Sequence, residues 1–238
     1  DRKPGIHLVK IDSANPARAI LNAVFEIKGV DANFGPKEFT TGPDGTIDLS
    51  ALDPGAYVVT EKKCPGYVID ESQRIIHLVP NQTAEFVFTN NKLPSLLLLK
   101  TSSDGLPLKG VSFRLAKIEE GSHYLDRTTS ATGEILWEGL EPGVYSLVET
   151  ATLNNHIISL KEHHVELFPG KVSEIVLENH KRPNLIVYKN DADSGEPIKD
   201  TVFVVKAADG HSVDEIKTGP DGKAELKNLL PGVYEISE

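Results

Sequence analysis

The chain has 238 residues, of which 39% are apolar, 25% are charged and 6% are aromatic, and its net charge is −10. Such an acidic, turn-rich composition is typical of a soluble globular protein and argues against nucleic-acid binding, which needs a basic surface. A single cysteine excludes an internal disulfide and a cysteine-based zinc site. No methionine is present, even at position 1, so we expect a processed chain or a fragment whose signal peptide or anchor lies elsewhere.

Short apolar or alternating segments predict β-strands along the whole chain. Examples are residues 75–79, 85–89 and 111–115, which are bounded by Gly, Pro, Asp and Asn. The longest apolar run, residues 96–99, is far too short to span a bilayer. No window has a helical period over more than two turns. The sequence therefore predicts an all-β protein.

Three sequence blocks recur with a period of about 90 residues, which is typical of tandem domains. The block Pro-Gly-x-Tyr-x-x-x-Glu occurs three times and ends at Glu61, Glu149 and Glu238. An apolar block with a lysine opens each repeat, at Lys10, Lys100 and Lys189. A closing block ends in asparagine twice, at Asn90 and Asn179. A phenylalanine follows each opening block, at Phe25, Phe113 and Phe203.

The repeats predict three domains, at residues 1–92, 93–181 and 182–238. The third stops at its glutamate and lacks a closing strand. Units of this size with several short strands fit a small β-sandwich. The linkers at 92–95 and 181–184 are short, so we expect the units to lie end to end.

Strand alternation places one polar residue at the end of each otherwise apolar face, because residues i, i+2 and i+4 share a face. In the first unit these polar residues are Lys10, Glu61 and Asn90, and in the second they are Lys100, Glu149 and Asn179. A lone lysine at a strand end usually reaches solvent. Recurrence in two units indicates burial instead, and a buried charge needs a partner. The pattern predicts either a salt-bridge network or a reaction.

The opening lysine, the Tyr-x-x-x-Glu after Pro-Gly and the closing asparagine together resemble the collagen-adhesin B-type (CnaB) domains. These domains build Gram-positive surface adhesins and sortase-assembled pilins. The resemblance covers the whole chain, with the third copy incomplete. It implies an all-β fold of tandem immunoglobulin-like (prealbumin-like/CnaB) β-sandwich domains arranged end to end.

The resemblance also implies a spontaneous isopeptide bond between lysine and asparagine, promoted by glutamate. Carried over by position, the bonded pairs are Lys10 with Asn90 and Lys100 with Asn179, promoted by Glu61 and Glu149 respectively. Lys189 and Glu238 would serve the third unit, which has no asparagine in this chain. Because Asn91 adjoins Asn90, a shift by one residue is an alternative, although alignment with Asn179 favours Asn90.

Elementary chemistry gives each residue type a role in such a bond. Burial lowers the pKa of a lysine and raises that of a glutamate, so a neutral amine can face a neutral acid. The amine attacks the carboxamide carbon, the acid hydrogen-bonds the developing oxyanion and shuttles a proton, and ammonia leaves. This is a single-turnover maturation step, so we do not expect an enzyme, a cofactor or a metal.

The function implied is a structural stalk segment of an extracellular, cell-wall-anchored bacterial adhesin or pilin. Its partners would be the neighbouring repeats, sortase and other pilin subunits. One alternative is a ligand-binding module that contacts a host protein or glycan through loops at the sandwich ends. Another is an accessory domain of a secreted enzyme, because similar sandwiches accompany catalytic domains.

Four weaker signals are each interpreted as structural. Cys64 follows two lysines that could lower its pKa, but we expect an incidental small residue in a loop. Residues 162–166, Glu-His-His-Val-Glu, place three possible metal ligands on one face, yet a solvated face is favoured. Residues 190–195 are similar to a calcium loop but lack its final glutamate. Trp137 is expected to pack rather than to bind sugar.

Overall fold

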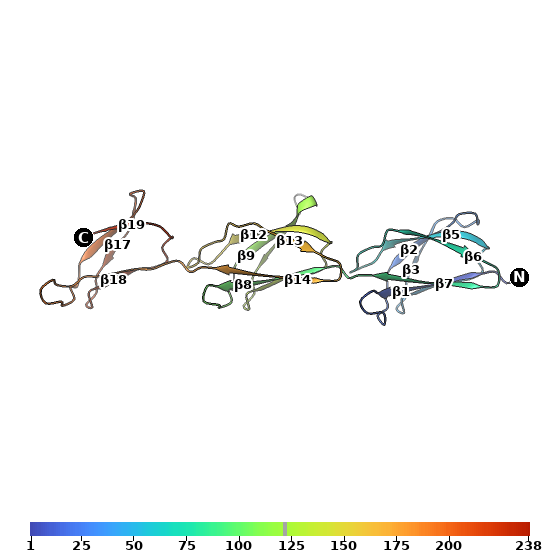
Figure 1. Cartoon of the computed structure of the whole chain (residues 1–238), viewed down its shortest axis with the longest axis horizontal. Coiled ribbons are helices and arrows are strands. Elements are labelled where there is room, and N and C mark those ends of the chain that lie inside the picture. Colours follow the sequence, from blue (N-terminus) through green and yellow to red (C-terminus); the bar gives the residue numbers. More distant parts are fainter. Residues whose placement is uncertain (121–122) are drawn as a thin grey trace. The chain divides into compact units, whose positions relative to one another are not determined.

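The computed structural model describes residues 1–120 and 123–238, and apart from one 3₁₀ turn at Ile118–Glu120 its regular elements are β-strands. The predicted all-β fold is confirmed (Figure 1). Among the described residues, no helix has the length and hydropathy that a bilayer crossing requires.

By proximity of Cα atoms the chain divides into two compact units. The first contains Asp1–Leu97, Leu136–Tyr145 and Val165–Glu174, and the second contains Leu98–Ile135, Ser146–His164 and Ile175–Glu238. This division does not follow the sequence repeats, so the boundaries at 1–92, 93–181 and 182–238 stay a prediction, as does their end-to-end arrangement.

The first repeat contains two sheets. Its strands are β1 (Gly5–Asp12), β2 (Val24–Gly29), β3 (Lys37–Thr40), β4 (Thr46–Leu49), β5 (Gly55–Lys63), β6 (Gln73–Leu78) and β7 (Thr83–Asn90). One sheet has the order β4-β1-β7 and the other β3-β2-β5-β6. Figure 1 shows β1 and β7 in one layer and β2 and β5 in the other. In the first layer β1 pairs antiparallel with β4 and parallel with β7.

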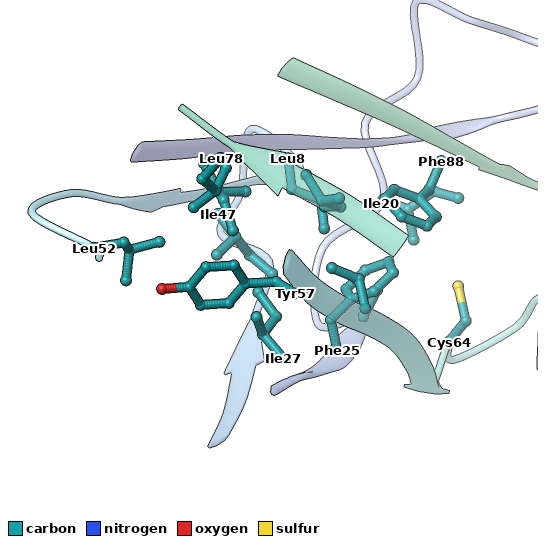
Figure 2. Packing of buried hydrophobic residues seen from close by; sticks show 14 residues of the cluster. Leu8, Ile20, Phe25, Ile27, Ile47, Leu52, Tyr57, Cys64, Leu78 and Phe88 are labelled. Carbon is teal, nitrogen blue, oxygen red and sulfur yellow. The ribbon is translucent and has the colours of Figure 1, made fainter. Parts of the chain in front are cut away.

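The two layers enclose an apolar core, because alternate residues of each strand point inward. Figure 2 shows Leu8, Phe25, Ile47, Tyr57 and Phe88 converging on this interior, and all five are buried. Full burial of a side chain of this size contributes roughly 1.5–3 kcal/mol. The core therefore fixes which face of each strand points inward.

The second repeat has the same sheet topology. Its strands are β8 (Ser95–Ser102), β9 (Ser112–Lys117), β10 (Tyr124–Thr128), β11 (Glu134–Trp137), β12 (Gly143–Ala151), β13 (His163–Leu167) and β14 (Val172–Asn179). The sheet orders are β11-β8-β14 and β10-β9-β12-β13. Trp137 is buried at 1% exposure, in accord with the expectation that it packs.

The third repeat forms smaller sheets. Its strands are β15 (Leu185–Tyr188), β16 (Val202–Ala207), β17 (Ser212–Lys217), β18 (Lys223–Leu226) and β19 (Tyr234–Ser237). The sheets are β15-β18 and β17-β16-β19. In the first two repeats the opening strand has a closing strand on its other side, at β7 or β14. Among the described residues, the opening strand β15 pairs with β18 alone.

The repeated Pro-Gly-x-Tyr segment forms a corner at the start of a strand. In every repeat the tyrosine hydroxyl donates to the backbone carbonyl four residues earlier: Tyr57 to Asp53 (2.8 Å), Tyr145 to Glu141 (2.9 Å) and Tyr234 to Leu230 (2.6 Å). Such tyrosine corners are common in β-sandwiches. The tyrosine and the glutamate four residues later share one face of the strand, so the corner also orients the glutamate.

Candidate functional site

Each opening lysine is held by a glycine in the neighbouring loop. The backbone N–H of Lys10 donates to the carbonyl of Gly45, and that of Lys100 to the carbonyl of Gly133, both at 2.8 Å. The φ angles of these glycines are +74° and +77°, a region that favours glycine. A Cβ at either glycine would meet the lysine carbonyl oxygen. The glycines therefore allow the close approach that fixes the lysine backbone.

The first cluster, defined as Lys10, Glu61 and Asn90, joins three strands across the interior. Lys10 on β1 pairs with Phe88, and Asp12 pairs with Asn90 at the end of β7, so lysine and asparagine lie on adjacent parallel strands. Glu61 comes from β5 in the opposite sheet. All three members are buried.

The atoms of the first cluster are in direct contact. Lys10 Nζ donates to Asn90 Oδ1 at 2.6 Å and lies 2.9 Å from Glu61 Oε1. Asn90 Nδ2 donates to Glu61 Oε2 at 2.7 Å. The same carboxylate oxygen also accepts the backbone N–H of Asp70 at 2.9 Å. The glutamate thus contacts both the amine and the carboxamide nitrogen.

The second cluster, defined as Lys100, Glu149 and Asn179, repeats this geometry. Lys100 Nζ donates to Asn179 Oδ1 at 2.7 Å and lies 3.1 Å from Glu149 Oε2. Asn179 Nδ2 donates to Glu149 Oε1 at 2.6 Å and to the hydroxyl of Thr152 at 2.9 Å. The structure therefore brings together the three predicted residue types in both repeats.

One carboxylate oxygen in each cluster faces the lysine. Glu61 Oε1 lies 2.9 Å from Lys10 Nζ and Glu149 Oε2 lies 3.1 Å from Lys100 Nζ, and both oxygens are buried. Within the described part of the chain, neither oxygen accepts a hydrogen bond from any other group. These oxygens are therefore suited to deprotonate the amine.

Aromatic rings lie beside both lysines and contribute to the apolar surroundings. Lys10 Nζ is 5.6 Å from the ring centroid of Phe25, and Lys100 Nζ is 5.7 Å from that of Phe113. Burial lowers the pKa of Lys100, and the attraction of Glu149 opposes this shift. Burial therefore increases the fraction of neutral, nucleophilic amine at this position.

A family model, described as a SpaA prealbumin-like fold domain, matches residues 4–92, 94–181 and 183–238. The chain belongs to this family. The expected resemblance is thereby confirmed at the level of the fold family. Comparison with curated protein sequences finds no match.

Solved structures similar to these prealbumin-like domains come from Gram-positive bacteria. The Bacillus anthracis TIE protein is 25% identical over 99% of this chain, which spans 45% of that protein, with a TM-score of 0.44. GBS52, the minor pilin of Streptococcus agalactiae, is 19% identical over 79% of this chain and 99% of its own, with a TM-score of 0.41. BcpA, the major pilin of Bacillus cereus, is 16% identical over 99% and 87%, with a TM-score of 0.42.

The third prealbumin-like repeat differs from the other two at the site. Lys189 Nζ lies 2.7 Å from Glu238 Oε2, but 32% of the lysine side chain and 53% of the glutamate side chain are exposed. The two predicted residues are brought together in contact with solvent. The surroundings that desolvate Lys10 and Lys100 are therefore incomplete around Lys189.

Asn91, the alternative to Asn90, points away from Lys10. Its Oδ1 accepts a short hydrogen bond from the hydroxyl of Ser13, and the residue is exposed. Asn90 is the asparagine whose carboxamide contacts Lys10.

Cys64 does not fit the expectation of an incidental loop residue. It follows the end of β5 but is only 4% exposed and belongs to the apolar core. Burial, followed by the charge of Glu61, raises the pKa of its thiol to about 11. The neighbouring lysines therefore do not activate it, and an anionic thiolate is excluded at neutral pH.

The remaining weak signals have structural explanations. His164 lies 3.4 Å from Glu162, and both side chains are largely exposed. No group of three or more possible metal-ligating His, Cys, Asp or Glu side chains occurs among the described residues. In the turn at residues 190–195, Asp191 accepts hydrogen bonds from the backbone of Asp193 and from Ser194. This carboxylate therefore stabilises the turn.

Sequence reasoning missed three contributors to the site. The repeat pattern identifies Phe25 and Phe113 but gives them no role, and it does not indicate that Gly45 and Gly133 bind the lysine backbone. Thr152 was not singled out, although it and Cys64 both stand three residues after the repeated glutamate. Superposing the repeats at that glutamate would have identified the position.

Proposed function

We propose that this chain is a stalk segment of a Gram-positive surface pilin or adhesin in which each complete repeat forms a lysine–asparagine isopeptide bond. The bonds join Lys10 to Asn90 and Lys100 to Asn179. The observation that carries the proposal is the buried contact of amine, carboxylate and carboxamide in both repeats.

The proton path follows from which carboxylate oxygen faces which nitrogen. In the first cluster, Glu61 Oε1 takes a proton from the Lys10 ammonium, and the neutral amine attacks Cγ of Asn90. While the Cγ–Nδ2 bond breaks, the carboxyl group of Glu61 passes this proton to Nδ2, which its Oε2 contacts at 2.7 Å. The carboxylate then takes the second proton of the attacking nitrogen and passes it to the departing ammonia, so the products are one secondary amide and one ammonium ion, and Glu61 is again a carboxylate.

This path differs from the oxyanion contact expected from sequence. Asn90 Oδ1 accepts from the lysine, whereas Glu61 contacts the carboxamide nitrogen. The glutamate is thereby assigned to proton removal from Lys10 Nζ and to proton delivery to Asn90 Nδ2. The developing oxyanion, on Asn90 Oδ1, stays beside Lys10 Nζ. The same assignment applies to Glu149 and Asn179.

Proximity and burial accelerate an otherwise slow reaction. A primary amide is a poor electrophile, but well-oriented neighbouring groups reach effective molarities of roughly 10⁵–10⁸ M. The loss of ammonia to solvent makes the step effectively irreversible. Because the product remains attached to the protein, each cluster acts once, as a maturation step.

The bond would carry tension past the core. In the first repeat, β1 leads into the domain, and β7 leads out beside it in parallel. A cross-link between Lys10 and Asn90 connects these strands directly, so the residues between them need not extend under force. By the chain-entropy model for disulfides, a loop of this length also contributes about 4–5 kcal/mol of stability.

The proposal includes the setting of the segment. We assign it to the cell surface, with its neighbouring repeats, other pilin subunits and sortase as partners, and with domain boundaries at 92/93 and 181/182. Membership in the prealbumin-like family and the repeated clusters support this assignment.

Intact-mass spectrometry of the purified chain tests the cross-links. Each bond removes the mass of one ammonia, so the proposal predicts a deficit of two ammonia masses from the sequence mass. The third repeat contributes none, because it lacks the asparagine. A mass equal to that of the unmodified sequence would overturn the proposal.

A further inference from the structure

The third residue after the repeated glutamate lies beside the asparagine carboxamide in both complete repeats. In the second repeat this residue is Thr152, whose hydroxyl accepts from Asn179 Nδ2 at 2.9 Å. In the first repeat it is Cys64, which is buried and lies close enough to Glu61 and Asn90 for both to influence the pKa of its thiol. Figure 2 shows Cys64 at the end of the core that holds Phe25 and Phe88.

The Thr152 hydroxyl completes the hydrogen bonding of the Asn179 amide. One bond from Asn179 Nδ2 runs to Glu149 Oε1 at 2.6 Å, and the other runs to Thr152 Oγ1. The amide oxygen accepts from Lys100. With both Nδ2 donors and the oxygen engaged, the plane of the carboxamide is fixed relative to the amine.

We propose that Thr152 is a positioning residue for bond formation: it orients the Asn179 carboxamide toward Lys100 and retains the leaving nitrogen next to Glu149. The inference rests on the proposed cross-linking function. The threonine itself exchanges no proton and forms no covalent bond. Its effect is to increase the time that the carboxamide spends in the reactive orientation.

Cys64 places a weaker acceptor at the equivalent position, close to Asn90. A thiol sulfur is a weak hydrogen-bond acceptor, whereas a hydroxyl is a good one. Asn90 therefore has one strong Nδ2 contact, to Glu61, where Asn179 has two. Replacement of Cys64 by threonine is expected to strengthen the orientation of Asn90.

The test follows each bond separately during synthesis of the full chain. The protein is made by cell-free translation at reduced temperature and quenched in acidic denaturant at intervals. After digestion, the bonded and free peptides of each repeat are quantified by mass. In every sample, the repeat that carries no substitution serves as the internal control.

The second-repeat variants separate the hydroxyl from the shape of the side chain. Thr152→Val keeps the branched shape without the hydroxyl, and we expect its bond to form about fivefold more slowly, as for the loss of one neutral hydrogen bond. Thr152→Ser keeps the hydroxyl and is expected to stay within about twofold of the parent rate. Equal rates for T152V and the parent would overturn the proposal, as would a T152S rate as low as that of T152V.

The first repeat provides an opposite test that does not depend on whether T152V folds. We expect Cys64→Thr to accelerate the Lys10–Asn90 bond about fivefold, and the control Cys64→Ala to give no acceleration. Equal rates for C64T and C64A would overturn the inference. A parent chain that never loses ammonia would instead overturn the cross-linking function on which the inference rests.

Discussion

The guanidinium of Arg74 lies over the ring of Phe88, 4.1 Å from its centroid, beside the first cluster. Its Nη1 also donates to the carbonyl of Val87 at 3.2 Å. In the second repeat the corresponding positions hold the smaller His163 and Leu177. Both line an open cavity of about 230 Å³ that reaches Lys100 and Glu149. The two clusters therefore differ in how closely side chains cover them.

Filling this cavity is expected to stabilise the second repeat. Leu177→Phe restores the ring found at Phe88 and is predicted to raise the free energy of unfolding by about 1 kcal/mol, because cavity filling commonly contributes this much. Val172→Phe, at an exposed position of the same strand, is the matched control. Thermal unfolding monitored by the fluorescence of Trp137, which lies in this repeat, provides the measurement. Equal midpoints for the two variants would contradict the prediction.

His156 is expected to make the second repeat sensitive to mild acid. It is 2% exposed, with Nε2 3.1 Å from Ser102 Oγ and Nδ1 2.8 Å from Asn155 Oδ1. Burial, followed by the charge of Lys181, lowers its pKa below the ordinary value of 6.5. The unfolded chain therefore binds more protons just below this pH, and stability is lost as the pH falls from about 6.5.

The first repeat offers the control for this titration. Tyr67 occupies the equivalent position and donates to Asp12 at 3.0 Å, so we expect His156→Tyr to reduce the loss of stability between about pH 7.5 and 5.5. Burial also lowers the pKa of His163. The double variant H156Y with His163→Gln is therefore expected to remove most of the pH dependence of the free energy of unfolding in this range. Substitution by Gln of His180, whose side chain is 73% exposed, is the matched control in the same repeat. If the free energy of unfolding of the double variant depended on pH as strongly as that of the parent, this explanation would be contradicted.

Gly133 is expected to be required for the position of Lys100 as well as for its turn. Gly133→Ala introduces a Cβ against the lysine carbonyl oxygen at a φ of +77°, so we predict a loss of more than about 2 kcal/mol and slower bond formation. Gly139→Ala has a similar φ of +67° but meets nothing within 4 Å. Its predicted cost is about 1 kcal/mol, with bond formation unchanged. Chemical denaturation and peptide mass would separate the two effects, and equal behaviour of the variants would argue against the steric role.

Removal of one glutamate should affect one bond only. In the Glu149→Ala chain the bond between Lys100 and Asn179 is not expected to form, so the measured mass is predicted to be one ammonia mass higher than that of the parent. The thermal midpoint is predicted to fall, because loss of the buried ion pair with Lys100 lowers the free energy of unfolding by about 3–5 kcal/mol. Glu162→Ala removes an exposed glutamate from the same repeat and serves as the control. A bond between Lys100 and Asn179 in the E149A chain would exclude the glutamate from the reaction.

The sequence predicted the all-β fold and the inward faces of the strands because alternation and repetition are local properties. Recurrence placed Lys10, Glu61 and Asn90 on those faces, and the structure places them in contact. The carboxamide nitrogen, rather than the oxygen, contacts the glutamate, and this detail depends on the packing of two opposed sheets. Cys64 illustrates the same limit, since its burial arises from neighbours distant in sequence.

Tandem mass spectrometry of the digested native chain tests the central claim most directly. The account predicts one branched peptide in which Lys10 is joined to Asn90 and another in which Lys100 is joined to Asn179, each lighter than its two component peptides by one ammonia. Recovery of all four peptides unlinked and at full mass would contradict the account.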